Sequence, residues 1–279
     1  MPDRRPPAPE TIRSRQNPKV AEARRIAHDP REARRAGLLL ADGVTLVLEA
    51  LRAGLAPRIV LADPDDAAAF APVRAEATLR RAPLVPASRK VLEAISTLAT
   101  PQGAVGIFAR PSHELAPLLA AAAHAGPPLV AILHGLQDPA NAGSLARTAL
   151  AAGLAGIVTT AGTVDPFHPR AVRASMGAVF RLPIATDADA APLFATLARS
   201  GYRRVALDPR GNVPLESIRL DRATAVLLGR EGSGLDAEAE AACEERVRIA
   251  MANGVESLGV AVAGAILFYS LARSRGALS

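Results

Sequence analysis

The order of apolar runs and amphipathic stretches predicts a small α/β domain in the first part of the chain. Short apolar runs that suit buried strands are Gly37–Leu40, Arg58–Leu61, Leu84–Val85 and Ala104–Phe108. Stretches in which apolar residues recur with a helical period are Val20–Ala36, Gly43–Ala53, Pro64–Leu79 and Ser88–Leu98. Together these elements make a unit of about ninety residues, the size of a small domain.

The second part of the chain alternates strand and helix patterns more regularly. Its strand candidates are Leu129–Leu133, Gly156–Thr160, Arg203–Leu207 and Ala225–Leu228, with helical stretches between them. This alternation predicts a parallel sheet covered by helices on both faces. Proline-rich segments bound the two parts, so we expect an arm over residues 1–18, a first domain over 19–110, a linker over 111–128 and a second domain over 129–279. The arm is basic and proline-rich and is expected to be flexible.

Composition narrows the class of protein. Of the 279 residues 49% are hydrophobic, which is enough for packed cores. No apolar stretch approaches the roughly 20 residues of a membrane span, and the N-terminus shows no secretory signal. We therefore expect a cytoplasmic protein with no membrane partner.

Metal and thiol chemistry are not predicted. Cys243 is the single cysteine, and the five histidines are scattered at spacings that fit no metal-ligand template. Glu244 and Glu245 follow Cys243 and oppose formation of a thiolate, so a packing role is favoured over a nucleophile.

Basic charge is concentrated near the N-terminus. The chain has 33 Lys and Arg against 27 Asp and Glu, and the first forty residues hold ten basic and five acidic side chains. Arginine binds phosphate with two parallel hydrogen bonds, so a nucleic-acid partner is one interpretation. A solvated helix face is the other.

The first informative motif follows the strand Leu129–Leu133. Asn141 is expected to cap a helix that Gly153 ends, so the motif lies at the carboxyl edge of the sheet. Gly143 and Arg147 fall on one helix face, and the missing side chain at Gly143 is expected to leave room for a ligand beside the guanidinium. On spacing alone, an ordinary surface arginine is the favoured interpretation of Arg147.

The second motif is the glycine-rich loop Gly229-Arg-Glu-Gly-Ser-Gly234, which follows a buried strand. It matches neither the Walker pattern nor the dinucleotide pattern. Its glycines allow close approach of the backbone to a ligand, and Glu231 places a carboxylate inside the loop.

The third motif passes from the apolar run Val247–Met251 through Asn253 and Gly254 into an apolar helix, Val255–Ala272. Asn253 is expected to cap this helix, with Glu256 completing a capping box and Gly276 ending the helix. Ser257 lies in its first turn.

In this order, the three motifs resemble those of the SpoU (TrmH) branch of the SPOUT RNA methyltransferases. The matching residues are Asn141, Gly143, Arg147, Gly229, Glu231, Gly232, Gly234, Ile249, Met251, Gly254, Ser257, Leu258 and Val260. Three further segments, Ser14–Val20, Leu40–Gly43 and Ser96–Gly103, are similar to the RNA-substrate-binding domain of this family. The resemblance implies a ribosomal-protein-like α/β domain followed by a parallel-sheet domain with a C-terminal trefoil knot.

The resemblance also implies the chemistry. It implies methyl transfer from S-adenosyl-L-methionine to a ribose 2′-OH of RNA, without a metal. Arg147 would hold a phosphate, because guanidinium stays protonated. A phosphate oxygen, water or Glu231 would take the proton, Asn141 would orient the ribose or Arg147, and Ser257 would hydrogen-bond within the site.

The implied binding partners are the cofactor, RNA and a second copy of the chain. The main chain of Gly229, Ile249, Met251 and Leu258 would hold the cofactor. RNA, with ribosomal RNA favoured over tRNA, would be bound by basic side chains that include Arg15, Lys19, Arg24 and Arg25. The family also implies a homodimer.

Two positions depart from the family pattern: Ala250 replaces a proline, and Gly259 replaces an asparagine. Ala250 lacks the fixed φ of proline, and Gly259 lacks the side-chain amide and disfavours helix. Both changes act against cofactor binding, but binding is still expected because the family holds the cofactor largely through backbone and apolar groups. They motivate an alternative, an RNA-binding or ribosome-assembly protein that keeps the fold with weakened catalysis. A tRNA 2′-O-methyltransferase is the other alternative.

Overall fold

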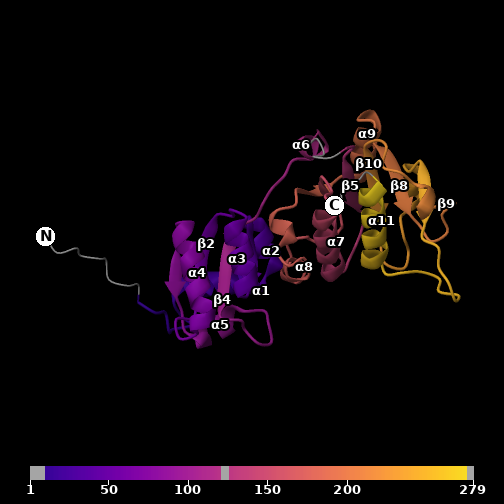
Figure 1. Ribbon diagram of the computed structural model, residues 1–279. Coiled ribbons are helices and arrows are strands. Elements are labelled where there is room, and N and C mark those ends of the chain that lie inside the picture. Colours follow the sequence, from indigo (N-terminus) through magenta and orange to yellow (C-terminus); the bar gives the residue numbers. More distant parts are fainter. Residues whose placement is uncertain (1–9, 121–125, 275–279) are drawn as a thin grey trace. The chain divides into compact units, whose positions relative to one another are not determined.

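The structure is a computed structural model that describes residues 10–120 and 126–274 (Figure 1). It separates into two compact units. The first contains the described residues up to Arg110 together with Phe167–Pro169, and the second contains the described residues from Pro111 to Pro166 and from Arg170 onward.

The first unit is a four-stranded sheet with helices packed on it. The strand order is β1 (Leu38–Asp42), β4 (Ala104–Ala109), β2 (Pro57–Ala62) and β3 (Leu84–Pro86). Strand β4 is antiparallel to β1 and β2, whereas β2 and β3 are parallel. The helices are α1 (Pro18–His28), α2 (Pro30–Arg35), α3 (Val44–Arg52), α4 (Ala67–Leu79) and α5 (Arg89–Ile95).

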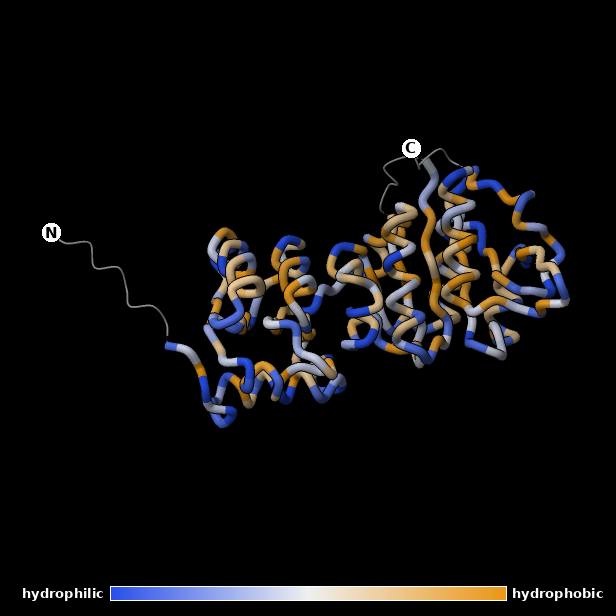
Figure 2. Tube along the Cα trace, turned by 60° about the horizontal axis from the view of Figure 1, so that its bottom comes forward, coloured by the Kyte–Doolittle hydropathy of each residue, from blue (hydrophilic) through white to orange (hydrophobic). Residues whose placement is uncertain are grey.

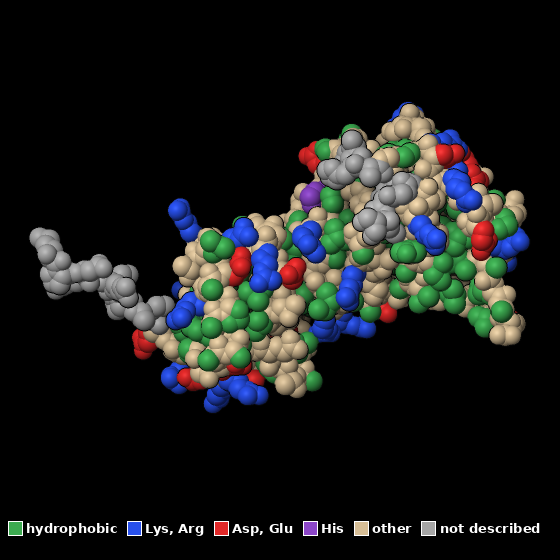
Figure 3. Space-filling view, viewed as in Figure 1, with side chains coloured by type: hydrophobic (Ala, Val, Ile, Leu, Met, Phe, Trp, Pro, Cys, Tyr) green, Lys and Arg blue, Asp and Glu red, His purple; other side chains and the backbone are tan. Residues whose placement is uncertain are grey.

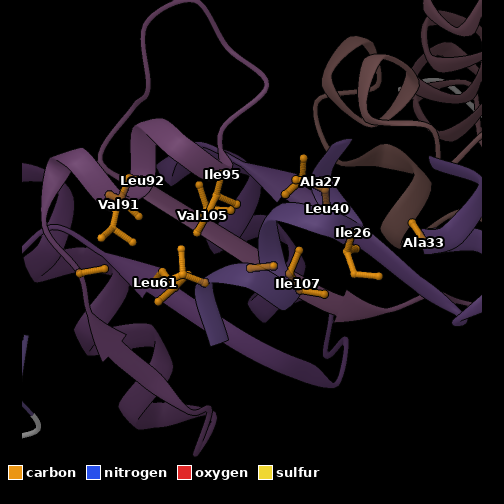
Figure 4. Close-up of a cluster of buried hydrophobic side chains, with 13 residues drawn as sticks. Ile26, Ala27, Ala33, Leu40, Leu61, Val91, Leu92, Ile95, Val105 and Ile107 are labelled. Atoms are coloured by element: carbon orange, nitrogen blue, oxygen red, sulfur yellow. The ribbon is translucent and has the colours of Figure 1, made fainter. Parts of the chain in front are cut away.

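The core of the first unit joins two helices to the sheet (Figure 4). Ile26 of α1 and Val91 and Ile95 of α5 pack with Leu61 of β2 and Ile107 of β4. Each of these side chains is at most 2% exposed. Burial on this scale contributes about 1.5–3 kcal/mol for each large aliphatic side chain, which fixes the helices on the sheet.

The helix expected over Val20–Ala36 is two helices in the structure. It breaks at Asp29, whose carboxylate accepts hydrogen bonds of 3.0 Å from the backbone N–H groups of Arg31 and Glu32. Pro30 has no N–H group to continue the α1 ladder, so it begins α2 instead.

Part of the expected arm is attached to the sheet. Residues 1–9 lie outside the described residues, but Ile12 forms a bridge with Ala87 beside β3. The backbone N–H of Ile12 donates to Pro86 and its carbonyl accepts from Ser88, both at 2.9 Å. These hydrogen bonds fix a segment that composition alone favours as flexible.

The second unit contains a seven-stranded parallel sheet. The strand order is β7 (Ile184–Ala188), β6 (Gly156–Thr160), β5 (Leu129–Leu133), β10 (Thr224–Leu228), β8 (Arg203–Leu207), β11 (Glu245–Arg248) and β9 (Val213–Pro214). All of its ladders are parallel, as the alternating pattern predicts. The helices are α6 (Leu115–Ala120), α7 (Pro139–Ala151), α8 (Pro169–Ala174), α9 (Ala190–Arg199), α10 (Ala237–Ala241) and α11 (Val260–Ser274), with single 3₁₀ turns at Ala178–Phe180 and Leu215–Ser217.

Central strands are the ones that the hydrophobic pattern finds. Every residue of β5, β6 and β10 is buried, and Figure 2 shows hydrophobic positions recurring along the helices and strands. The strand β7 escapes the pattern because its second half is partly exposed and includes Asp187. Strand β9 has two residues only, too few for a periodic signal.

Helix α11 packs on α7. Among the described residues, no helix is both long and apolar enough to cross a membrane. The trefoil knot implied by the family resemblance stays a prediction.

Candidate functional site

A cavity of about 490 Å³ opens at the carboxyl ends of the parallel strands of the second unit. Segments that follow β8, β10 and β11 line it, together with the start of α11. This is the edge at which open α/β sheets bind ligands, because the loops there carry main-chain and side-chain polar groups that the sheet itself does not use.

Seven of the eight catalytic and cofactor residues expected from the sequence line this cavity: Asn141, Gly229, Glu231, Ile249, Met251, Ser257 and Leu258. They come from four segments that lie up to about 117 residues apart in the chain. Arg147 is the exception. Parallel strand order brings the other residues together because all their strands end at one edge.

The glycine-rich loop is a tight hairpin that only glycine permits at its first position. Arg230 and Gly234 exchange two backbone hydrogen bonds, of 2.9 and 3.0 Å. A Cβ atom at Gly229 would lie 2.2 to 2.4 Å from the backbone of Gly234 and Leu235. The closed hairpin therefore presents its main chain to the cavity in one fixed form.

Asn141 and Glu231 connect the first two motifs. The side-chain Nδ2 of Asn141 donates to Glu231 Oε1 at 2.9 Å. The expected capping role of Asn141 is wrong, because α7 begins at Pro139 and Asp138 Oδ1 accepts from the N–H of Ala140. Asp138 therefore caps the helix, and the amide of Asn141 is left to bind the loop carboxylate.

Glu231 is held as a carboxylate. Partial burial acts to raise its pKa, but the hydrogen bond from Asn141 and backbone N–H donors, including those of Gln137 and Asp138, lower the pKa below its ordinary value overall. A carboxylate stabilised in this way is a poor proton acceptor. The geometry fits a group that orients Asn141 better than it fits a general base.

Gly143 has a packing role that differs from the expected one. A Cβ atom there would lie 2.2 Å from the carbonyl oxygen of Ala171 and 2.9 Å from the Cβ of Ala174. Helix α8 therefore fills the space that was expected for a ligand. Arg147 is exposed on α7, and no hydrogen bond or ion pair holds its guanidinium within residues 10–120 and 126–274.

The loop of the third motif is longer than expected, because it continues to Gly259 and the expected helix start at Val255 lies within it. Helix α11 begins at Val260, so the expected cap at Asn253 and capping box with Glu256 are wrong. Asn253 adopts a left-handed φ of 57° in a turn, which the expected cap conformation excludes. Gly276, the expected helix end, lies outside the described residues.

Gly259 lies immediately before α11 rather than inside it. Its carbonyl accepts from the N–H of Ala263 at 3.0 Å, which is the bond of a residue at the N-cap position. Glycine is tolerated there at a cost of a few tenths of a kcal/mol relative to asparagine. The expected helix penalty therefore does not apply, and nothing lies within 4 Å of a Cβ atom built at this position.

The described residues contain no group of three or more His, Cys, Asp or Glu side chains able to hold a metal ion. Cys243 is half-buried, and burial raises the pKa of its thiol to about 12. Its Sγ donates to the carbonyl of Ala239. These contacts fit the packing role favoured by its acidic neighbours.

Sequence reasoning missed polar residues at the ends of β5, β8 and α10. Asp208 and Arg210 line the cavity after β8. His134 directly follows β5 and contacts Asp236, which caps α10. The available signals were the position of His134 directly after a buried strand and an aspartate before a short alanine-rich helix.

Comparison with known proteins identifies the class. The model of the SpoU rRNA Methylase family matches residues 128–269, about half of the chain, and the model of the MRM3-like substrate binding domain matches residues 17–106. The chain belongs to the SpoU rRNA methylase family.

Individual relatives show which proteins the chain is similar to. An uncharacterized tRNA/rRNA methyltransferase of Mycobacterium tuberculosis is 40% identical over 54% of each chain, so this chain spans about half the length of the mycobacterial relative that it matches. The 23S rRNA (guanosine(2553)-2′-O)-methyltransferase of Bacillus subtilis is 28% identical over 93% of this chain and 98% of its own. The AdoMet-bound rRNA methyltransferase of Sinorhizobium meliloti has a TM-score of 0.82 and 29% identity, covering 97% of this chain and 99% of that one.

Proposed function

We propose that this chain transfers the methyl group of S-adenosyl-L-methionine to a ribose 2′-OH of ribosomal RNA. The observation that carries the proposal is the cavity at the carboxyl ends of β8, β10 and β11, where the family motif residues converge. The relative in B. subtilis is a 2′-O-methyltransferase of 23S rRNA by name, and the structure from S. meliloti was determined with AdoMet bound.

The cavity suits a nucleoside held by main-chain groups. Ile249, Met251 and Leu258 line it, and their backbone N–H and C=O groups make no hydrogen bond to any residue that the structure describes. The apolar side chains suit the flat face of an adenine. The main-chain N–H and C=O groups beside them can hydrogen-bond to its polar edge. The glycine-rich hairpin, which has no room for a side chain at Gly229, forms one wall of the cavity.

The bound cofactor would supply an electrophilic methyl group, and the side chains of this chain would supply position. Arg147 has an exposed guanidinium with no partner among the described residues, and it can hold the phosphate beside the target ribose with two hydrogen bonds. Asn141, fixed by the charged Glu231, can orient the ribose. The proton of the 2′-OH then passes to a phosphate oxygen or water, because the lowered pKa of Glu231 makes it a weak acceptor. Ser257 lines the cavity and is exposed, so its hydroxyl is available to the RNA.

The first unit is proposed to bind the RNA. Figure 3 shows Lys and Arg side chains at several places on the visible face of this unit. Among the four candidate residues, Lys19 and Arg24 have no hydrogen bond or ion pair from their side chains within the described residues. Arg15 donates from Nε to the carbonyl of Lys90, and Arg25 pairs with Glu32 at 2.8 Å. All four residues can still contribute to a positive potential, with Lys19 and Arg24 the freest to bind phosphate.

The assembly is proposed to be a homodimer that acts in the cytoplasm. Helix α11 exposes Val262 and Tyr269, with 54% and 56% of each residue accessible. A second copy of the chain covering this face would bury both side chains.

The proposal is tested by mapping 2′-O-methyl groups on cellular rRNA and tRNA with and without the gene. We expect one rRNA site to disappear on deletion, to return with the parent chain and to stay unmodified with Arg147→Ala. A vanished tRNA site would transfer the proposal to tRNA. No vanished site, together with no binding of S-adenosylmethionine at about millimolar concentration in calorimetry, would overturn it.

Arg147 also offers a sharp separation of binding from chemistry. Because it lies outside the cavity, Arg147→Ala should leave the dissociation constant for S-adenosylmethionine within about twofold of the parent value while kcat falls about a hundredfold or more. The exposed Arg199→Ala on α9 is a matched control that should change neither quantity.

A further inference from the structure

His134 touches both ends of the glycine-rich loop. Its backbone N–H donates to the carbonyl of Leu228 at 2.9 Å, where β10 ends and the loop begins. Its ring Nε2 lies 2.8 Å from Oδ2 of Asp236, where the loop ends and α10 begins. The intervening residues 229–235 all line the cavity. One residue therefore spans the base of the hairpin.

The contact with Asp236 has a defined direction. The backbone N–H of Ala239 and the hydrogen bond from His134 lower the pKa of Asp236, so its carboxylate is charged and can only accept. Nε2 of His134 must therefore carry a proton and donate. The same carboxylate uses Oδ1 to accept from Ala239 at 2.9 Å, so it joins α10 to the end of β5.

The other side of the ring is also fixed. Nδ1 of His134 lies 3.1 Å from Oγ1 of the buried Thr160, which is 3.3 Å from Oγ1 of Thr163. Thr163 Oγ1 donates to the carbonyl of Leu133 at 3.0 Å and accepts from the N–H of Gly135 at 2.9 Å. The Thr160 hydroxyl has a single proton: it donates to Nδ1 when His134 is neutral, and it accepts from Nδ1 and donates to Thr163 when His134 is charged, so Nδ1 has a partner in both forms.

The side chain of Arg230 passes close to the same place. A Cβ atom at Gly135 would lie 2.6 Å from Nε of Arg230, so this guanidinium crosses the backbone next to His134. Only 12% of the His134 side chain is exposed, which leaves few alternative rotamers. The loop is thus fixed at its start and at its end by His134.

From these contacts we infer that His134 is a positioning residue for the cofactor loop, acting through Asp236 to hold residues 229–235 in the form that binds the nucleoside. The inference rests on the proposed function for the identity of the ligand. The hairpin by itself has two reciprocal backbone bonds, and these are weak unless its ends are fixed, because an isolated short hairpin is marginal in water. Fixing both ends removes conformational entropy before the cofactor arrives, which favours binding.

The first experiment needs no cofactor. Hydrogen exchange of the Arg230 and Gly234 amides reports the closed hairpin in the full-length chain. In His134→Ala we expect these amides to lose about tenfold or more of their protection. His134→Gln retains an amide nitrogen that can donate to Asp236, so it should recover most of the loss. Unchanged protection in a folded His134→Ala chain would overturn the inference, whether or not the protein binds S-adenosylmethionine.

The second experiment measures the loss in binding. His134→Ala should raise the dissociation constants for S-adenosylmethionine and S-adenosylhomocysteine alike, by about tenfold, while kcat at saturating cofactor stays within about threefold. Equal binding by parent and variant would reject the positioning role and leave the proposed function intact. Failure of the parent chain to bind would reject the proposed function, and the exchange experiment would still decide the inference.

Two further variants separate positioning from general stability. Asp236→Ser keeps a good helix cap but is too short to reach His134, so its effect should match that of His134→Ala and should not add to it in the double variant. Tyr202→Phe removes a buried hydrogen bond to the carbonyl of Leu119, away from the loop. It should leave cofactor affinity unchanged. Equal loss in Tyr202→Phe would show that stability alone causes the effect and would overturn the inference.

Discussion

The side-chain amide of Asn141 donates a 2.9 Å hydrogen bond to the carboxylate of Glu231, across 90 residues of sequence. The bond joins the first turn of α7 to the hairpin that follows β10. It also supplies part of the reason that the pKa of Glu231 is lowered. The two residues therefore act as one unit, in which the charge is on Glu231 and the group free to face the substrate is Asn141.

Replacing Glu231 by glutamine tests whether the carboxylate positions Asn141 or takes the proton. The pKa of Glu231 lies below its ordinary value, so the carboxylate stays charged until the pH falls to that lowered pKa. The hydrogen bond from Asn141 weakens only when the pH falls further. We expect Glu231→Gln to reduce kcat about tenfold while the pH–rate profile between about pH 6 and about pH 9 keeps its shape. Loss of a titrating limb in the variant would assign the proton to Glu231 instead.

Alanine should destabilise the protein much more at Gly143 than at Gly259. Gly143→Ala forces α7 away from α8, because its Cβ would lie 2.2 Å from the Ala171 carbonyl oxygen. We expect a loss of about 2 kcal/mol in the free energy of unfolding, despite the better helix propensity of alanine. Gly259→Ala has open space and loses only the N-cap preference of glycine over alanine, so it should cost less, about 0.5–1 kcal/mol. Urea unfolding followed by circular dichroism measures both, and equal losses would contradict the packing role of Gly143.

Gly259→Asn tests whether the departure from the family pattern weakens the site. Asparagine is a better helix cap than glycine, so the variant should gain a few tenths of a kcal/mol in the free energy of unfolding. Cofactor affinity measured by calorimetry should stay within about threefold of the parent value. A much larger gain in affinity would show that the missing amide limits binding in this chain.

Arg24 and Arg25 are neighbours with different electrostatic surroundings. Arg25 pairs with Glu32 at 2.8 Å, whereas no ion pair within the described residues holds Arg24. We expect Arg24→Gln to weaken RNA binding and to reduce the slope of log affinity against log salt by about one, with a smaller change for Arg25→Gln. Filter binding at several salt concentrations measures the slopes. Identical parent and Arg24→Gln slopes would exclude this face from the RNA contact.

Asp42 anchors the segment Ser96–Gly103 to the end of β1. This buried carboxylate accepts from Ser96 Oγ at 2.9 Å and from the N–H and Oγ1 of Thr97 at 2.6 and 2.9 Å. Asp42→Ala should destabilise the first unit by about 3 kcal/mol, because it leaves several donors unpaired, and Ser96→Ala by about 1 kcal/mol. Hydrogen exchange of the β1 and β4 amides reads out this unit separately. Equal effects of the two variants would refute the anchoring role.

The sequence by itself determined the features that depend on near neighbours in the chain. Continuous apolar runs predict the buried strands Leu129–Leu133 and Ala225–Leu228. The alternation of these strands with helices predicts that their sheet is parallel. Because parallel strands end at one edge, convergence of Asn141, Glu231 and Ser257 could be expected from the motifs. The capping pattern at Asn253 gave a wrong helix start. The pattern is local, whereas the residues before Val260 form a loop that lines the cavity, and α11 begins only after that loop.

Only the tertiary structure decided the contacts that no local pattern encodes. Gly143 is required by the approach of α8, and His134 meets Asp236 across 102 residues. Both contacts depend on how helices and strand ends pack, and sequence periodicity reports which face of an element is buried without reporting what lies against it. The sequence shows that Gly143 and His134 are present, but the close packing of distant segments determines which residues they contact.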